Sequence, residues 1–299
     1  MKTFQLTSIV MALTALTGTA RAQEIALTFD DLPSHGSLPP GQTRITVIQG
    51  IIAALQAARV PPVYGFVNGV RLQGEPESAP VLRLWREAGY PLANHTWTHM
   101  RLDTATAWTA DVAKNESLLV NLMGRGDWRW LRYPFLAEGQ GEQRAAARNW
   151  LAEHHYKVAS VTMSFDDWAY TDTYARCVTR DDNIAVTELE QRWLAAADSS
   201  LNYYRGLSRS LYGRDIPYVL LMHVGAFTAR MLPRLLALYH DRGVTLVSLE
   251  QAESDPFYVD EVRSAASPAP ATLENAARAR GMPVPPKGWN SGDLGQVCR

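Results

Sequence analysis

Two histidines, His95 and His99, stand four positions apart in the run His95-Thr96-Trp97-Thr98-His99. On an extended strand their rings would be roughly 13 Å apart, at about 3.3 Å per residue, and could not share one ion. On a helical turn, residues at this spacing lie on one face. The spacing therefore predicts a shared metal site only where the chain turns at His95. The alternative is a pair of partly buried polar side chains.

Two adjacent carboxylates, Asp30 and Asp31, directly follow an apolar run. Like charges this close repel each other, so a cation is a natural partner. If Asp31 joins His95 and His99, the site has two nitrogen ligands and one oxygen ligand, and positions stay open for water and substrate, as in catalytic zinc sites. Asp30 is then free to act as a base on that water. The alternative is a carboxylate pair that caps a turn before Pro33.

The elements that must position these groups alternate along the chain between short β-rich runs and stretches of helical apolar spacing. The seven expected strands cover 24–29, 62–67, 90–94, 130–133, 157–162, 218–222 and 244–248. The expected helices cover 43–58, 79–88, 105–122, 142–153, 188–207 and 228–242. This alternation predicts an α/β fold of parallel strands, with about seven strands against the eight of a regular βα barrel.

Two segments do not fit the repeating unit. Residues 166–187 are expected to form a long connection, and 251–299 a Pro-rich and Ala-rich tail. Long connections in compact domains are usually functional or disordered, and the first begins within the candidate chemistry. The expected division is a catalytic domain at 23–250 and a C-terminal extension at 251–299 that packs on the barrel or trails from it.

Chemically competent side chains fall at or just after the ends of the expected strands. In parallel α/β folds catalytic groups gather at that edge of the sheet. The residues in question are Asp30, Asp31, His95, His99, Arg132, Asp166, Asp167 and His223.

The set resembles the polysaccharide deacetylases that share the NodB-type domain, known as carbohydrate esterase family 4. Five motifs of that family have counterparts here, in the family's order: Thr28-Phe29-Asp30-Asp31, His95-Thr96-Trp97-Thr98-His99, Arg132-Tyr133-Pro134-Phe135, Asp167-Trp168 and Leu221-Met222-His223. The resemblance implies a distorted (β/α) barrel and one divalent metal ion. Zn²⁺ suits such ligands best, and Co²⁺, Ni²⁺ or Mn²⁺ can also occupy them.

The resemblance also implies a role for each residue on the metal side of the site. Asp31, His95 and His99 would hold the ion. Asp30 would be the catalytic base, and Arg132 would orient it.

On the substrate side, the resemblance implies that His223 is the general acid and that Asp167 orients it. The backbone N–H of Tyr133 would help hold the oxyanion. Trp168 and Leu221 would line the acetyl pocket.

Two departures from the family's motifs bear on substrate contacts more than on the reaction. Ser164 stands where the fourth motif often carries an additional aspartate, for which Asp166 is a nearby substitute. Phe135 replaces a tyrosine often found after the proline of the third motif. His35 and Gly36 follow the aspartate pair, and an ordinary loop is the favoured interpretation over an edge of the cleft.

The expected function is a metal-dependent hydrolase that removes N-acetyl groups from a peptidoglycan-like or chitin-like polysaccharide or oligosaccharide. An O-acetyl esterase acting on a glycan is an alternative. Two histidines and a carboxylate also form the facial triad of non-haem iron oxygenases. A non-catalytic glycan-binding protein is a further alternative, although the base, ligands and acid are all present in the sequence.

The first 22 residues predict a signal peptide, because Lys2 precedes the apolar stretch 9–16 and Ala20-Arg21-Ala22 fits a cleavage site. The mature protein would be periplasmic or secreted, and no later segment is long and apolar enough to span a membrane. Without Lys2 and Arg21, the 29 basic residues fall to 27 against 30 acidic residues, a net charge of −3. That charge indicates no binding to nucleic acid or to an anionic membrane.

Both cysteines, Cys177 and Cys298, lie in the part expected to be exported. An oxidising compartment would allow them to pair. A disulfide that ties the tail to the 166–187 connection and two free thiols stay equally open. The oligomeric state is not indicated.

Overall fold

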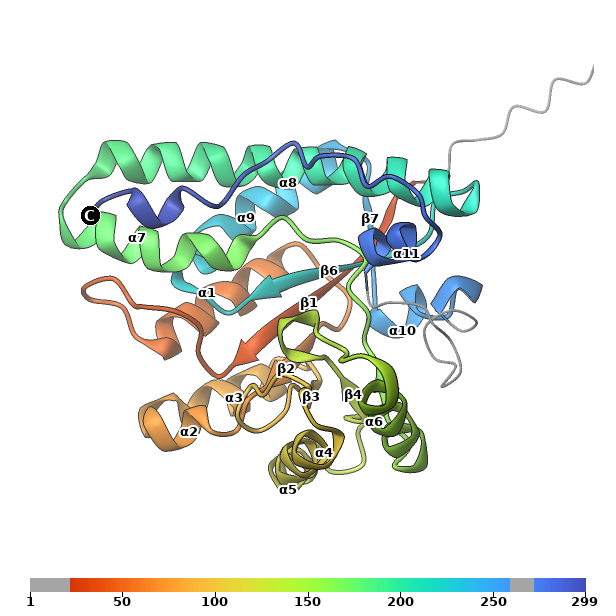
Figure 1. Cartoon of the computed structure of the whole chain (residues 1–299). Helices are drawn as coiled ribbons and strands as arrows, with labels where there is room; N and C mark the ends of the chain where they lie inside the picture. Colours follow the sequence, from red (N-terminus) through yellow and green to blue (C-terminus); the bar gives the residue numbers. More distant parts are fainter. Residues whose placement is uncertain (1–21, 259–271) are drawn as a thin grey trace, which may run out of the picture.

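In the computed structural model, which describes residues 22–258 and 272–299, the chain forms seven parallel strands surrounded by helices (Figure 1). The strand order is β5-β4-β3-β2-β1-β6, and β7 pairs with the start of β1. The predicted α/β fold with a distorted barrel of parallel strands is therefore confirmed. The strands are β1 (Glu24–Leu32), β2 (Tyr64–Val67), β3 (Leu92–Asn94), β4 (Trp130–Leu131), β5 (Lys157–Val158), β6 (Tyr218–His223) and β7 (Thr245–Val247).

The sheet curls until its two edges meet through the segment that follows β5. Met163 forms a parallel bridge with Leu220 of β6, and Leu221 N donates to Met163 O at 3.1 Å. The strand predicted at 157–162 is therefore only partly correct. Residues 157 and 158 pair with β4, and the chain then crosses to β6. This crossing closes the ring with fewer strands than a regular barrel has.

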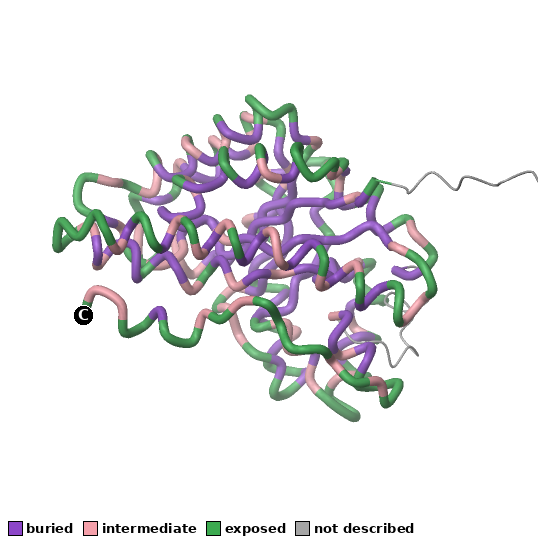
Figure 2. The backbone as a smooth tube through the Cα atoms, turned by 90° about the horizontal axis from the view of Figure 1, so that it is seen from above, coloured by how far each residue is buried: buried purple, intermediate pink, exposed green. Residues whose placement is uncertain are grey.

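Helices cover the outside of the sheet, and the buried residues concentrate between the two layers (Figure 2). No helix in the described parts of the chain combines the length and the apolar character that crossing a bilayer requires. The helices are α1 (Arg44–Ala57), α2 (Arg71–Gly74), α3 (Ala79–Glu87), α4 (Ala105–Lys114), α5 (Glu116–Met123), α6 (Gly141–Glu153), α7 (Tyr170–Thr179), α8 (Asn183–Tyr212), α9 (Ala226–Asp241), α10 (Leu249–Ala252) and α11 (Leu273–Ala279).

The single helix expected at 105–122 is wrong, because the chain breaks between α4 and α5 at Asn115. The side chain of Asn115 is fully buried, and its Nδ2 donates to Val67 O at the end of β2 at 2.7 Å. Asparagine competes for hydrogen bonds outside the helix, which makes it a poor interior residue. The break lets this amide reach the sheet.

The long connection expected at 166–187 is also wrong, because most of it is helical. Helix α7 buries Tyr170, Tyr174 and Cys177, which follow one another at helical spacing. Helix α8 begins with Asp182 as its N-cap, whose Oδ1 accepts from Ala185 N at 3.0 Å, well before the expected start at 188. The interior face of α7 is built from aromatic, threonine and cysteine side chains, which obscures the apolar pattern that predicts helices.

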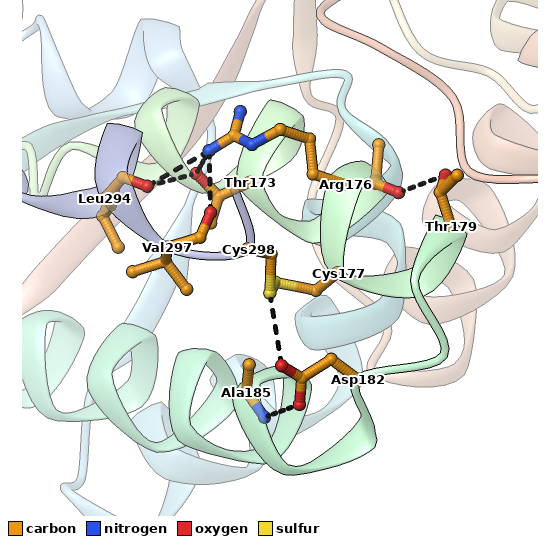
Figure 3. The surroundings of a disulfide bond; sticks show 10 residues. Thr173, Arg176, Cys177, Thr179, Asp182, Ala185, Leu294, Val297 and Cys298 are labelled. Atoms are coloured by element: carbon orange, nitrogen blue, oxygen red, sulfur yellow. Dashed lines mark hydrogen bonds between the residues drawn. A yellow bond between two sulfur atoms is a disulfide. The ribbon is translucent and has the colours of Figure 1, made fainter.

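The C-terminal segment 272–299 packs on the helical layer. It begins with α11, runs along α8 and ends beside α7 (Figure 1). Cys298 forms a disulfide with Cys177, so of the two alternatives for the cysteines the structure contains the bond (Figure 3). Beside it, Arg176 Nη2 donates to Leu294 O and to Val297 O, both at 3.2 Å. The segment is thus held by a covalent bond and by hydrogen bonds to its backbone.

Replacing Cys177 and Cys298 together by serine is expected to lower the free energy of unfolding by about 2–4 kcal/mol, because the bond closes a loop between residues 121 positions apart. Urea unfolding of the variant and of the parent protein measures the difference. The parent under reducing conditions serves as a second form without the bond. An unchanged unfolding midpoint in both forms would show that the bond does not stabilise the fold.

Candidate functional site

A bulge in β1 brings the two carboxylates to one cleft. The pairing register with β2 shifts between Phe29 and Leu32, and Asp31 has a left-handed backbone with φ of 66°. Neighbouring residues of a regular strand point to opposite faces, whereas a bulge re-aims one of them. Asp30 and Asp31 therefore both line the cleft at the carboxyl end of the barrel.

The two histidines meet because the chain turns sharply after β3. Thr96 and His99 have left-handed backbones, with φ of 62° and 59°. The turn that a shared metal site requires is present, although it is not helical. His95 Nε2 lies 3.6 Å from Asp31 Oδ1, and His99 Nε2 lies 3.5 Å from the same oxygen.

Buried amides hold this turn in place. Asn68 Nδ2 donates to the carbonyl oxygens of His95 and Thr96, at 2.5 and 3.1 Å. Thr96 N donates to Asn94 Oδ1 at 2.9 Å. Sequence reasoning missed this role of Asn68 and Asn94. Their signal in the sequence is an asparagine at or directly after the end of a short apolar strand.

The ring of Trp97 packs against the backbone of Gly69, which gives the turn a second support. A Cβ on Gly69 would lie 2.2 Å from Trp97 Cζ3. Lys114 Nζ also lies over the Trp97 ring, 4.9 Å from the ring centroid. The turn that carries both histidines therefore depends on the absence of a side chain at position 69.

Asp31, His95 and His99 each offer an oxygen or nitrogen atom that is available to bind a divalent metal ion. Asp31 Oδ1 is buried and has no hydrogen-bond partner among the described residues. His95 Nδ1 lies 2.8 Å from Arg132 O, which can only accept, so Nδ1 carries the hydrogen and Nε2 keeps its lone pair. Burial, together with the neighbouring His95, lowers the pKa of His99 to about 4, so its ring is neutral at physiological pH. These three atoms belong to one group that could hold an ion.

His35 also reaches the site, so the interpretation of that position as an ordinary loop is wrong. Its Nδ1 lies 2.8 Å from Asp31 Oδ2, and its ring lies 4.7 Å from the ring of His223. Burial alone would raise the pKa of Asp31, but the His35 hydrogen bond and the neighbouring histidines lower it overall. Asp31, His35 and His223 form a second group with atoms close enough to hold an ion. In that group Asp31 Oδ2 is already engaged by His35, whereas Oδ1 toward His95 and His99 is free.

Arg132 holds Asp30 from behind the cleft. Its Nη1 donates to Asp30 Oδ1 and its Nη2 to Thr28 Oγ1, both at 3.0 Å. Its Nε donates to Ala159 O at 2.8 Å, and the guanidinium lies over the Phe66 ring at 4.6 Å. The contact fixes one oxygen of Asp30, and the other points toward His95 Nε2 at 3.6 Å.

On the opposite side of the cleft, Asp167 holds His223. Asp167 Oδ1 lies 2.9 Å from His223 Nδ1, and Oδ2 accepts from His223 N at 2.8 Å and from Thr228 Oγ1 at 3.2 Å. Burial works against the charged imidazole, but the charge and hydrogen bond of Asp167 outweigh it and raise the pKa of His223 to about 9. His223 is therefore a cation at neutral pH.

The cleft has a volume of about 630 Å³, within the range of small-molecule sites. Of the ten candidate residues, Arg132 and Asp167 lie buried behind it, and the other eight line it. Trp168 and Phe135, which both line the cleft, are 52% and 59% exposed. The ring of Tyr133 stacks on Trp108, with centroids 5.0 Å apart, in the buried core.

Asp166, the nearby substitute for the aspartate that Ser164 replaces, lines the cleft but has one carboxylate oxygen engaged outside it. Its backbone is left-handed, with φ of 61°, and its Oδ2 accepts hydrogen bonds from Trp289 Nε1 and Ser291 Oγ, both at 3.2 Å. One oxygen of this carboxylate is thus bound to the C-terminal segment, while the neighbouring Asp167 holds His223.

A family model described as polysaccharide deacetylase matches residues 17–159. Residues 17–159 thus form part of a polysaccharide deacetylase domain. The matched span includes both aspartates of β1, both histidines of the turn and Arg132. Asp167 and His223 lie beyond it, and the fold brings them to the same cleft.

Solved structures of this deacetylase family share the fold. The family 4 carbohydrate esterase from Streptomyces lividans in complex with acetate is 19% identical, with a TM-score of 0.50 over 78% of this chain and 97% of that chain. The peptidoglycan deacetylase PdaC from Bacillus subtilis is 19% identical, with a TM-score of 0.50 over 78% and 91%. A family 4 pseudoenzyme from Bacillus anthracis is 13% identical, with a TM-score of 0.53 over 78% and 66%. No curated protein matches the chain significantly.

Replacing Gly69 by alanine is expected to weaken metal binding by at least about tenfold, because the new Cβ would displace Trp97 and the turn that carries the histidines. Isothermal titration with Zn²⁺ measures the affinity. Gly74→Ala is the matched control, since a Cβ there meets nothing within 4 Å. Equal affinities in the two variants would show that the turn does not depend on Gly69.

Proposed function

We propose that the protein is a metal-dependent hydrolase that removes N-acetyl groups from an extracytoplasmic polysaccharide or oligosaccharide. The observation that carries the proposal is the free Asp31 oxygen between two imidazole nitrogens, with a fixed carboxylate and a cationic histidine on either side. The match to the deacetylase family model supports the same reaction class.

We propose that Asp31, His95 and His99 hold one divalent ion, most readily Zn²⁺, with Co²⁺, Ni²⁺ or Mn²⁺ as alternatives. When bound, such an ion lowers the pKa of water from about 15.7 toward 7 and polarises a carbonyl group. The neutral His99 and the fixed tautomer of His95 support this assignment.

Asp30 is the base in this proposal. Arg132 engages Asp30 Oδ1, so the other oxygen remains available to accept a proton from the attacking water. Because Arg132 is buried and held by three hydrogen bonds, the base is oriented before substrate binds.

His223 is the general acid in this proposal. An amine leaves poorly unless it is protonated, and Asp167 keeps His223 charged and its Nδ1 engaged, so that Nε2 can donate. The backbone N–H of Tyr133 would stabilise the developing oxyanion, a contribution typically worth about 3–4 kcal/mol. Trp168 and Leu221 would contact the acetyl group at the cleft.

We also propose that the protein is exported, with a catalytic domain at 23–250 and an extension at 251–299. The predicted signal peptide at 1–22 lies almost wholly outside the described residues. The Cys177–Cys298 disulfide fits an oxidising compartment and supports the proposal.

Purified mature protein is expected to release acetate from N-acetylated oligosaccharides, to stop after chelation and to recover with one divalent metal. Asp30→Asn is expected to lower kcat by about 10²–10⁴-fold with metal affinity largely retained, because it removes the base. His99→Ala is expected to lose metal affinity as well. Acetate assays and metal titrations measure the two effects.

Two results would contradict parts of this proposal. If metal binds through His99 but no N- or O-acetylated glycan yields acetate, the metal-site assignment stands and deacetylation is excluded. The absence of metal binding would exclude the proposed ligands.

Asp167→Asn is expected to move the alkaline limb of the kcat–pH profile from near 9 to lower pH. The protonated His223 is the active form, so activity falls as pH rises through its pKa, and removal of the neighbouring charge lowers that pKa. Rates between pH 5 and 10 measure the shift. Asp241→Asn is the matched control, because Asp241 is exposed at the end of α9. An unmoved limb would show that His223 is not the titrating acid.

A further inference from the structure

The cleft has one wall that does not belong to the barrel. This wall consists of Tyr204 of α8 and five residues of the C-terminal segment. These five are Thr272, Glu274, Asn275, Arg278 and Lys287. A segment that follows the last strand thus stands beside the proposed base, ligands and acid.

The wall is anchored directly to the catalytic edge of the barrel. Asp166, next to the residue that holds His223, accepts hydrogen bonds from Trp289 and Ser291 of the segment. The Trp289 ring packs on Tyr203 of α8 with centroids 5.4 Å apart. With the disulfide at Cys298, the segment is fixed at both its middle and its end.

The charges that the wall presents to solvent are positive. Glu274 is only 9% exposed, and its Oε1 accepts from Tyr204 Oη at 2.9 Å and lies 3.7 Å from Lys287 Nζ. Arg278 is exposed and donates from Nη1 to Asn275 Oδ1 at 2.8 Å. Among the described residues Arg278 has no carboxylate partner. A guanidinium in this position can form paired hydrogen bonds with a carboxylate.

We propose that the segment 272–298 is a glycan-binding wall of the cleft and that Arg278, assisted by Lys287, recognises a carboxylate substituent on the glycan. The inference rests on the proposed function of the same cleft and names its substrate class. The substrate is then an acidic N-acetylated oligosaccharide in preference to a neutral one. Catalysis at the metal side would not depend on this contact, so the wall acts on binding.

The test compares an N-acetylated tetrasaccharide that carries lactyl ether carboxylates with its methyl ester, and a second pair that carries uronic acid carboxylates with its ester. Binding is measured by titration calorimetry with the zinc-loaded Asp30→Asn protein, which does not require turnover. KM and kcat are measured with protein that retains Asp30. The two pairs separate the two sources of the carboxylate.

The acid form of at least one pair is expected to bind about tenfold more tightly than its ester, and Arg278→Ala is expected to abolish the difference through KM at unchanged kcat. Arg83→Ala, an exposed arginine of α3 outside the cleft, is the matched control and is expected to keep the difference. Trp289→Phe, which removes the hydrogen bond to Asp166, is expected to weaken binding of acid and ester alike.

Equal affinity for acid and ester, discrimination that survives Arg278→Ala, or no binding of any form would overturn the inference. Acetate release with equal KM for acid and ester would overturn it while the deacetylase proposal stands. Tighter binding of the acid than of the ester, without acetate release, would support the proposed role of the wall and exclude the proposed reaction.

Discussion

The buried guanidinium of Arg132 joins the parts of the barrel that must meet for the site to exist. Its side chain binds Asp30 and Thr28 of β1, Ala159 after β5 and the ring of Phe66 in β2. Its own carbonyl oxygen accepts from His95. A buried charge is costly unless it is paired and its hydrogen bonds are satisfied, and removing one partner of such a pair typically costs about 3–5 kcal/mol. Arg132, which directly follows the two-residue strand β4, therefore positions both the proposed base and one proposed metal-binding ring.

In the site, aspartates that are adjacent in sequence bind different partners. Each adjacent carboxylate pair is divided between two tasks. Asp30 binds Arg132, whereas Asp31 faces the histidines. Asp167 holds His223, whereas Asp166 holds the C-terminal segment. Left-handed backbone at Asp31 and Asp166 makes this division possible, because it turns side chains that are adjacent in sequence toward different partners.

Sequence reasoning reached the fold class and the charged residues at the strand ends from periodic signals, whereas Tyr133, Trp168 and Leu221 came only from the family resemblance. Strand ends of a parallel sheet share one edge, so polar residues after apolar runs converge there. It missed the helix α7, whose buried face uses aromatic and polar side chains, and the break at Asn115, which depends on a tertiary hydrogen bond. It also missed the wall of 272–298, since contacts between residues more than a hundred positions apart leave no local pattern.

The position of β1 in the sheet has a consequence for how the chain reaches its folded state. This strand is the first to be synthesised, yet one of its sides pairs with β6, so that Thr28 and Leu220 join across 192 positions. Its opening residues pair with β7, which comes later still. Contacts between distant parts of a chain are slow to form, because the intervening loop must first be ordered. β1 can therefore pair with β2 soon after both are made, but its contacts with β6 and β7 must wait until residues 218–247 have been added.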